Sequence, residues 1–183
     1  MKRIVDLVGA GIALVLLTPL LVASAIAVGA TSRGGVFFRQ TRVGRGGVPF
    51  VMLKFRSMVD AAEASGGWET LPNDPRVTRV GRLLRRTSID ELPQLLNVIR
   101  GDMSLVGPRP LVPAQEFDHE AEQWRERCTV RPGMTGLAQV ALRSEAGDRR
   151  IELDLEYVRS MSVGLDFKIM FGTIRRLGGS GGN

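Results

Sequence analysis

One long apolar run near the N-terminus constrains what this chain can fold into. Residues 4–30 carry a single charged side chain, Asp6, close to the start of the run. As a helix, such a run is long enough to cross a hydrocarbon core of about 30 Å. It exceeds the apolar region of a secretory signal, so a membrane role is the more economical interpretation. A buried core helix is the alternative, but a domain of this size could hardly cover so uniform a surface.

How this run meets the membrane stays open between two interpretations. Pro19 removes a backbone donor from the middle of the run, at a cost of about 3 kcal/mol in a helix interior. Thr18 can return a hydroxyl to a freed carbonyl, so a bend is tolerable in lipid. Both flanks are basic, which leaves little bias for a full crossing. A re-entrant helix bent at Thr18-Pro19 satisfies both flanks, and a kinked spanning helix is the alternative.

The remaining sequence predicts an α+β chain that is mostly helical. Residues 1–33 form the membrane-inserted helix, 34–177 a small domain polar enough to face water, and 178–183 a flexible linker or cloning remnant. The domain is expected to hold a β-hairpin and amphipathic surface helices. The last helix has basic ends and can lie on an anionic membrane surface or pack on the core. The hairpin is predicted from 35–42 and 48–56, a loop with a short helix at 59–75, and helices at 80–86, 92–99, 114–127, 150–162 and 166–177.

Composition removes several kinds of site. The lone cysteine, Cys128, excludes an internal disulfide and a cysteine zinc cage, and the lone histidine, His119, excludes a multi-histidine metal site. The formal charge of +6, from 25 Lys+Arg against 19 Asp+Glu, points to an anionic partner. Nucleic acid is disfavoured, because aromatics are only 5% and an acidic stretch at 116–126 interrupts any basic stripe.

An acidic pair in a basic setting is the strongest candidate for chemistry. Asp90 and Glu91 are adjacent, so on a helix they diverge by about 100° and cannot face one bond as in a glycosidase. They can act in sequence, one as nucleophile and the other as its assistant. Helix capping is the competing interpretation, since Ser88 to Glu91 fits a capping box. Pro93 disfavours a cap at Ser88, because it would then fall inside the first turns.

Cations gather around this pair in the sequence. Arg109 lies between Pro108 and Pro110, which restrict its backbone and present its side chain at low entropic cost. Guanidinium groups match phosphate oxygens, so a carboxylate nucleophile, fixed cations and a membrane anchor together predict phosphoryl transfer onto a lipid. A divalent ion would shield the charges, with Mg²⁺ or Mn²⁺ held by oxygen ligands. The candidate cations are Lys54, Arg56, Arg79, Arg82, Arg85, Arg86 and Arg109.

These segments together resemble the bacterial sugar transferase family, the monotopic phosphoglycosyl transferases, in its minimal catalytic-core form. The resemblance covers almost the whole chain outside the Gly-rich tail, and the long run ending in Pro-Arg-Pro is highly specific. The stretches that carry it are 36–58, 73–110, 130–140 and 154–157.

The resemblance implies transfer of a sugar-1-phosphate from a UDP-sugar to polyprenyl phosphate, usually undecaprenyl phosphate, with release of UMP. It also implies Mg²⁺, a ping-pong mechanism and a place at the start of glycoconjugate assembly. The helix would be re-entrant in the bacterial inner membrane, and residues 34–177 would form the catalytic domain facing the cytoplasm. On this chain, Asp90 would attack the β-phosphorus and contact Mg²⁺, and Glu91 would assist. Lys54 and Arg85 would contact phosphate, and the segment Gly107-Pro108-Arg109-Pro110 would shape the nucleotide end of the pocket.

Two departures from the family pattern stand out. Residues 140–143 replace the Asn-Gly-Arg type of continuation, which puts a donor-binding role for Arg143 in doubt, and the pair at the bend is Thr-Pro rather than Ser-Pro. A non-enzymatic, membrane-attached module that binds anionic lipid or nucleic acid through its basic face is the alternative function. The sequence does not name the sugar, the pathway or the oligomeric state.

Overall fold

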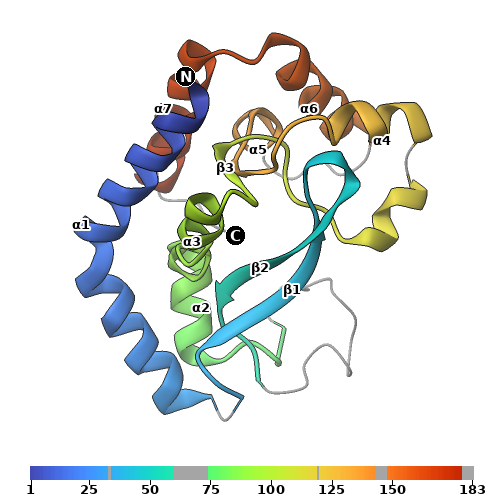
Figure 1. Cartoon of the computed structure of the whole chain (residues 1–183). Helices are drawn as coiled ribbons and strands as arrows, with labels where there is room; N and C mark the ends of the chain where they lie inside the picture. Colours follow the sequence, from blue (N-terminus) through green and yellow to red (C-terminus); the bar gives the residue numbers. More distant parts are fainter. Residues whose placement is uncertain (33, 60–73, 119, 143–147, 179–183) are drawn as a thin grey trace.

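A computed structural model describes residues 1–32, 34–59, 74–118, 120–142 and 148–178. One long helix, α1 (Lys2–Thr31), runs along the outside of a domain built from short helices, a β-hairpin and one pair of parallel strands (Figure 1). The remaining elements are β1 (Phe37–Val43), η1 (Arg45–Gly47), β2 (Pro49–Phe55), α2 (Arg79–Arg86), η2 (Ile89–Glu91), α3 (Gln94–Arg100), β3 (Ser104–Val106), η3 (Pro113–Asp118), α4 (Ala121–Arg127), β4 (Gly133–Thr135), α5 (Leu137–Ala141), α6 (Asp148–Ser160) and α7 (Val163–Gly178).

Helix α1 bows around the domain and packs on α3, α2 and β3 (Figure 1). Pro19 lies inside the continuous helix, and the Thr18 hydroxyl donates to Leu14 O at 2.7 Å. Pro19 has no N–H to donate to Val15 O, so that carbonyl is the one left free. The Thr18 hydroxyl instead bonds to the carbonyl before it, Leu14 O, and the expected hydroxyl bond forms one residue early. Large apolar side chains along the outer face are exposed, among them Ile4, Val8, Ile12, Val15, Leu16, Val22 and Ile26. By length and composition, α1 is the one helix in the described ranges that could cross a membrane.

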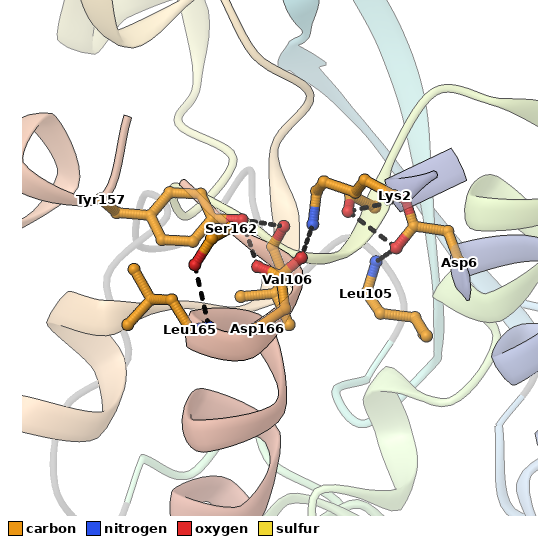
Figure 2. Close-up of polar contacts among 9 residues, drawn as sticks. Lys2, Asp6, Leu105, Val106, Tyr157, Ser162, Leu165 and Asp166 are labelled. Atoms are coloured by element: carbon orange, nitrogen blue, oxygen red, sulfur yellow. Dashed lines mark hydrogen bonds and ion pairs between the residues drawn. The ribbon is translucent and has the colours of Figure 1, made fainter. Parts of the chain in front are cut away.

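Polar contacts fix the N-terminal end of α1 to the domain (Figure 2). Lys2 Nζ lies 2.6 Å from Asp166 Oδ2, and the Tyr157 hydroxyl donates to Asp166 Oδ1 at 2.7 Å. Asp6 accepts hydrogen bonds from the Ser104 hydroxyl and the Leu105 amide, at 2.9 and 3.0 Å. The only charged residue within the apolar run is therefore buried against β3.

The C-terminal half of α1 packs against the same domain through apolar contacts. Val28 is buried with Phe55 of β2 and Leu84 of α2. Leu21 and Ala25 join this cluster from α1, and Ile89 of η2 joins it from the domain. Both ends of the helix therefore lie on one domain.

The β-hairpin and α3 are held together by one buried amide. The predicted hairpin is confirmed as β1 and β2, which pair antiparallel with Phe38 opposite Lys54. Asn97 of α3 is fully buried; its Oδ1 accepts from Leu53 N at 3.0 Å, and its Nδ2 donates to Val51 O at 2.7 Å. The Asn97 side chain thus hydrogen-bonds the backbone of β2 as a neighbouring strand would. It fixes the register of Lys54, the next residue along β2, relative to α3.

Several expected elements are confirmed with adjusted ends. The helices predicted at 80–86, 92–99, 150–162 and 166–177 correspond to α2, α3, α6 and α7. Helix α7 packs on the core through the buried Ile169, while Phe167, Phe171 and Ile174 are exposed, and its place on a membrane surface stays a prediction. The parallel strands β3 and β4 and the short α5 were not predicted. The division into 1–33, 34–177 and 178–183 stays a prediction, and the predicted 59–75 loop falls almost entirely outside the described residues, as do His119 and Arg143.

One open alternative is decided, and one local prediction is wrong. The capping box at Ser88, which Pro93 disfavoured, does not form: Ser88 has left-handed backbone (φ 55°) and no side-chain cap bond, and α3 begins only after Pro93. The single helix expected at 114–127 is divided into η3 and α4. Glu120 has extended backbone (ψ 136°), and the new direction of the chain buries Trp124 beside Val43 and Cys128. Burial of the indole outweighs continuation of one helix.

Asn97→Leu tests the buried amide. The substitution keeps the branched shape of the side chain but leaves Leu53 N–H and Val51 O on β2 without their partners, so the free energy of unfolding should fall by about 3 kcal/mol. Chemical denaturation in detergent measures it. Ile99→Ala, on the exposed face of the same helix, is the control and should lose less. A loss under about 1 kcal/mol in Asn97→Leu would mean that β2 does not depend on the amide.

Candidate active site

The acidic pair lies in a tight turn between two helices. Asp90 and Glu91 form η2 with Ile89, directly after α2 and before α3. Ser88, just before this turn, is the one non-glycine residue with positive φ in the described parts of the chain. A serine held in this region costs about 1–3 kcal/mol, and such strain is concentrated at functional sites. The strained residue turns the chain so that the two carboxylates face the domain interior rather than capping α3.

Glu91 is anchored by Lys54. Lys54 Nζ, from β2, lies 2.7 Å from Glu91 Oε1. Both side chains are largely covered, with 19% and 31% of their surfaces exposed. A charge pair this shielded from water is stronger than one at an open surface. The contact joins the hairpin to η2 and brings together two residues that were predicted for the site.

Asp90 is buried and keeps its carboxylate oxygens available. Its residue is 7% exposed, and within the described ranges no donor from another residue reaches its side chain. Arg85 contributes a positive charge to its surroundings from α2. Arg85 Nε donates to Ser57 Oγ at 2.8 Å, which holds the guanidinium in place.

Gly81 makes that placement of Arg85 possible. Helix α2 passes so close to Ser57 that a Cβ at position 81 would lie 1.9 Å from Ser57 O. Only glycine allows this approach. The Thr78 hydroxyl accepts from Gly81 N at 2.9 Å and fixes the start of the helix at the same point.

The two carboxyl groups have opposite pKa shifts. Burial raises the pKa of Asp90 above its ordinary value, and the positive charge of Lys54 only partly opposes this. Burial would also raise the pKa of Glu91, but the charges of Lys54 and Arg109, the Lys54 hydrogen bond and the charge of Arg42 together lower it. Neighbouring acids whose environments separate their pKa values are typical of sites that divide chemical roles between two groups.

The segment Gly107-Pro108-Arg109-Pro110 borders the pair as a rigid strap. Gly107, Pro108 and Pro110 are buried, whereas the Arg109 side chain is exposed and its charge acts on Glu91. Gly107 passes close to the start of β4: a Cβ there would lie 2.9 Å from Gly133 N and 2.5 Å from Arg131 O, just before the strand. The strap therefore presents one cation to the site from a fixed backbone. Arg109 is the only member of the strap whose side chain takes part in the electrostatics of the pair.

Sequence reasoning missed Arg42. Its Nη1 donates to Pro110 O at 3.1 Å, and its charge also lowers the pKa of Glu91. The residue was counted only as part of the basic flank of the membrane run. The period-2 alternation of β1 was a usable signal. Phe38 pairs with Lys54 across the hairpin, so Phe38, Gln40 and Arg42 lie on the same face of the hairpin as Lys54. Of the other predicted cations, Arg79, Arg82 and Arg86 are exposed on α2.

A metal ion at this site would be held only in part by the protein. Among the described residues, no group of three or more His, Cys, Asp or Glu side chains could hold an ion. Asp90 offers carboxylate oxygens that accept from no other residue in the described parts of the chain, while Glu91 is already paired with Lys54. Hard cations such as Mg²⁺ are commonly bound by one or two carboxylates, with water and substrate phosphate as further ligands. The donor set fits such an ion.

Comparison with known proteins decides the family. The chain matches the family described as bacterial sugar transferase over residues 1–179. The chain belongs to the bacterial sugar transferase family. The resemblance found in the sequence is thereby confirmed, and the acidic turn, Lys54 and the strap all lie within the matched range.

Bacterial sugar transferases similar to this chain have named activities. It is 46% identical, over 96% of its length, to a UDP-glucose:undecaprenyl-phosphate glucose-1-phosphate transferase of Caulobacter vibrioides. It is 45% identical over 95% of its length to the Escherichia coli K12 protein of the same name. A UDP-N-acetylgalactosamine-undecaprenyl-phosphate N-acetylgalactosaminephosphotransferase of Aeromonas hydrophila is 43% identical over 96% of the chain. The aligned region covers 69%, 39% and 43% of these proteins, respectively.

Lys54→Met tests the electrostatics of the pair. Without the cation, the pKa of Glu91 should rise, as a carbon-13 titration of the labelled carboxyl would show. The lowered pKa stabilises the folded state above the unfolded pKa of Glu91, and this stabilisation is lost as pH falls through the folded pKa. Lys54→Met should lose this pH-dependent stabilisation of the folded state. Arg149→Met, on the exposed part of α6, should leave the Glu91 titration unchanged; an unshifted Glu91 in Lys54→Met would contradict the assignment.

Proposed function

We propose that this chain transfers a sugar-1-phosphate from a UDP-sugar to undecaprenyl phosphate and releases UMP. The observation that carries the proposal is the buried carboxylate of Asp90, which has no partner among the described residues and lies beside the Lys54–Glu91 ion pair. The named relatives support the substrate class, since their names specify UDP-sugars and undecaprenyl phosphate. Because those names include both glucose and N-acetylgalactosamine, the sugar itself is to be found by a screen of UDP-sugars for UMP release.

The proposed reaction has two steps. One oxygen of Asp90 attacks the β-phosphorus of the UDP-sugar and forms a phosphorus–oxygen bond, while the bond to the bridging oxygen breaks and UMP leaves with that oxygen. A phosphate oxygen of the lipid then attacks the same phosphorus and displaces Asp90. The product is a polyprenyl-diphospho-sugar, and the free carboxylate is restored. Glu91 assists by handling the acceptor proton or by orienting the site.

Fixed positive charge supports both steps. Lys54, Arg85 and Arg109 come from three different elements and act electrostatically on the pair. They can stabilise the charge that develops on the transferring phosphoryl group without reorganising. Bound Mg²⁺, or Mn²⁺ in its place, would be held by Asp90 and would neutralise phosphate charge.

A re-entrant α1 fits the geometry better than a spanning helix. The first turn of α1 is bound to Asp166, Ser104 and Leu105, and its last turns pack on Phe55 and Leu84 of the same domain. A helix that crossed the bilayer would carry one of these ends away from the domain. In our proposal, the bowed helix dips into the inner membrane from the cytoplasmic side, with its exposed apolar face in lipid.

Asp90→Asn should abolish turnover while leaving the fold intact. The amide cannot form the proposed bond to phosphorus, so UMP release should fall by at least about 1000-fold, or roughly 4 kcal/mol of barrier. A coupled assay for UMP, with EDTA as the metal control, measures it. Glu152→Gln, an exposed acid on α6, should retain the parent rate.

The donor half-reaction separates covalent from direct transfer. Protein mixed with UDP-sugar and Mg²⁺, without lipid, should gain the mass of one phosphosugar, on a peptide that contains Asp90. Asp90→Asn should gain nothing. UMP release at the parent rate in Asp90→Asn would refute the nucleophile. UMP release that requires lipid, with no mass gain under rapid quench, would favour direct transfer instead.

Cysteine accessibility tests the topology. In a Cys128→Ser background, single cysteines at Ala30 and in a short extension ahead of Met1 should react with an impermeant maleimide from the same, cytoplasmic side. Inverted vesicles and intact spheroplasts give the two sides. Labelling of the two positions from opposite sides would establish a spanning helix and reject the re-entrant one.

A further inference from the structure

The strap, residues 107–110, and Leu111 directly after it are held through an unbroken series of backbone carbonyls. The carbonyls of four successive residues each accept a hydrogen bond from a different part of the chain. Pro108 O accepts from Gly133 N and Leu111 O from Val43 N, both at 2.9 Å. Between them, Arg109 O accepts from Arg127 Nη2 and Pro110 O from Arg42 Nη1. Arg127, which is buried, and Arg42, which is half-buried, thus hold the middle of the strap, which has no neighbouring strand to pair with among the described elements.

Arg127 is held in turn by a buried ion pair. Its Nε and Nη2 lie 2.9 and 2.8 Å from Asp154 Oδ2 on α6. The side chains are 5% and 7% exposed, and the guanidinium lies 6.0 Å from the centroid of Trp124. One guanidinium therefore connects α4, α6 and the strap.

Stability alone does not account for such a pair. Removing two charges from water costs several kcal/mol, and apolar residues of the same volume often serve stability equally well. What an apolar pair could not do is donate to a carbonyl on the strap. The planar guanidinium has several donors in a fixed arrangement, so contact with Asp154 also fixes the direction of the bond to Arg109 O.

The residue whose carbonyl is held is also the one that presents a cation to the site. Arg109 is exposed between two buried prolines, and its charge acts on Glu91. In the described ranges, no acceptor from another residue is paired with its guanidinium. A shift of the Arg109 carbonyl would rotate the backbone from which that side chain projects. The strap offers few other degrees of freedom, because the prolines on both sides fix φ.

We propose that Arg127, oriented by Asp154, is a positioning residue for donor binding. It fixes the Arg109 backbone so that the Arg109 guanidinium meets the diphosphate of the UDP-sugar. The inference rests on the proposed function and extends it to a pair of residues with no contact to the acidic turn. Arg127 acts only through Arg109, and that dependence can be measured.

A matched ion pair serves as control. Arg159 of α6 pairs with Glu126 of α4 at 2.7 Å, so it joins the same two helices as Arg127 and Asp154. It is exposed and has no contact with the strap. Arg159→Gln should therefore leave donor binding unchanged, even if it weakens the packing of α4 on α6.

The test is a double-mutant cycle on the full-length protein. Arg127→Lys keeps the charge beside Asp154 but lacks the fork that reaches both partners. It should raise the KM for UDP-sugar in UMP release, and the Kd for UDP by calorimetry, by about 10-fold. Arg109→Ala should do the same. If Arg127 acts through Arg109, the double variant should be no worse than Arg109→Ala alone.

Each outcome bears on the inference. Additive effects in the double variant, or an unchanged KM and Kd in Arg127→Lys, would overturn it. Should Arg127→Lys fail to fold, Asp154→Asn keeps an acceptor for Arg127 and should show the same dependence on Arg109 to a smaller degree. A parent protein that releases no UMP from any UDP-sugar would instead refute the proposed function, and the UDP affinities would still judge the role of Arg127.

Discussion

The ion pair between Lys54 and Glu91 is the constraint around which this domain is arranged. Two adjacent acids in a buried turn would repel each other and lose hydration unless cations from elsewhere offset their charge. Lys54 comes from β2, Arg85 from α2 and Arg109 from the strap. The hairpin, α2 and the strap must therefore converge on η2. Their convergence is a requirement of the charge as much as of the apolar core.

Close backbone approaches make this convergence possible. Gly81 lets α2 lie against Ser57, and Gly107 lets the strap cross β4. Asn97 supplies the missing strand partner of β2 and fixes the position of Lys54. None of these residues needs to contact a substrate, yet each sets the place of one that can.

The sequence was sufficient for what depends on local pattern. The apolar run, the hairpin glycines and the basic run before Asp90 predicted α1, the β-hairpin and α2, and the position of the acidic pair was clear. The capping box at Ser88, a local alternative, does not form, and Ser88 instead has left-handed backbone beside Ile89, which packs on α1. Arg42 and Arg127 were missed because their partners lie 68 and 18 residues away along the chain. A single sequence shows charge and period, and it does not show which distant carbonyl a guanidinium reaches.

The contact between Ile89 and α1 joins the long apolar helix and the acidic turn in one unit. Ile89 immediately precedes Asp90 and packs in the cluster that contains Leu21, Ala25 and Val28. In the proposed re-entrant placement, this contact would hold the turn close to the level at which the helix leaves the lipid. In the proposed reaction, the acceptor phosphate remains at the membrane surface because its polyprenyl chain is buried in hydrocarbon. A nucleophile fixed to α1 at that level meets the phosphate without drawing the lipid out of the bilayer, whereas one on a freely hinged domain would have to be ordered at each turnover.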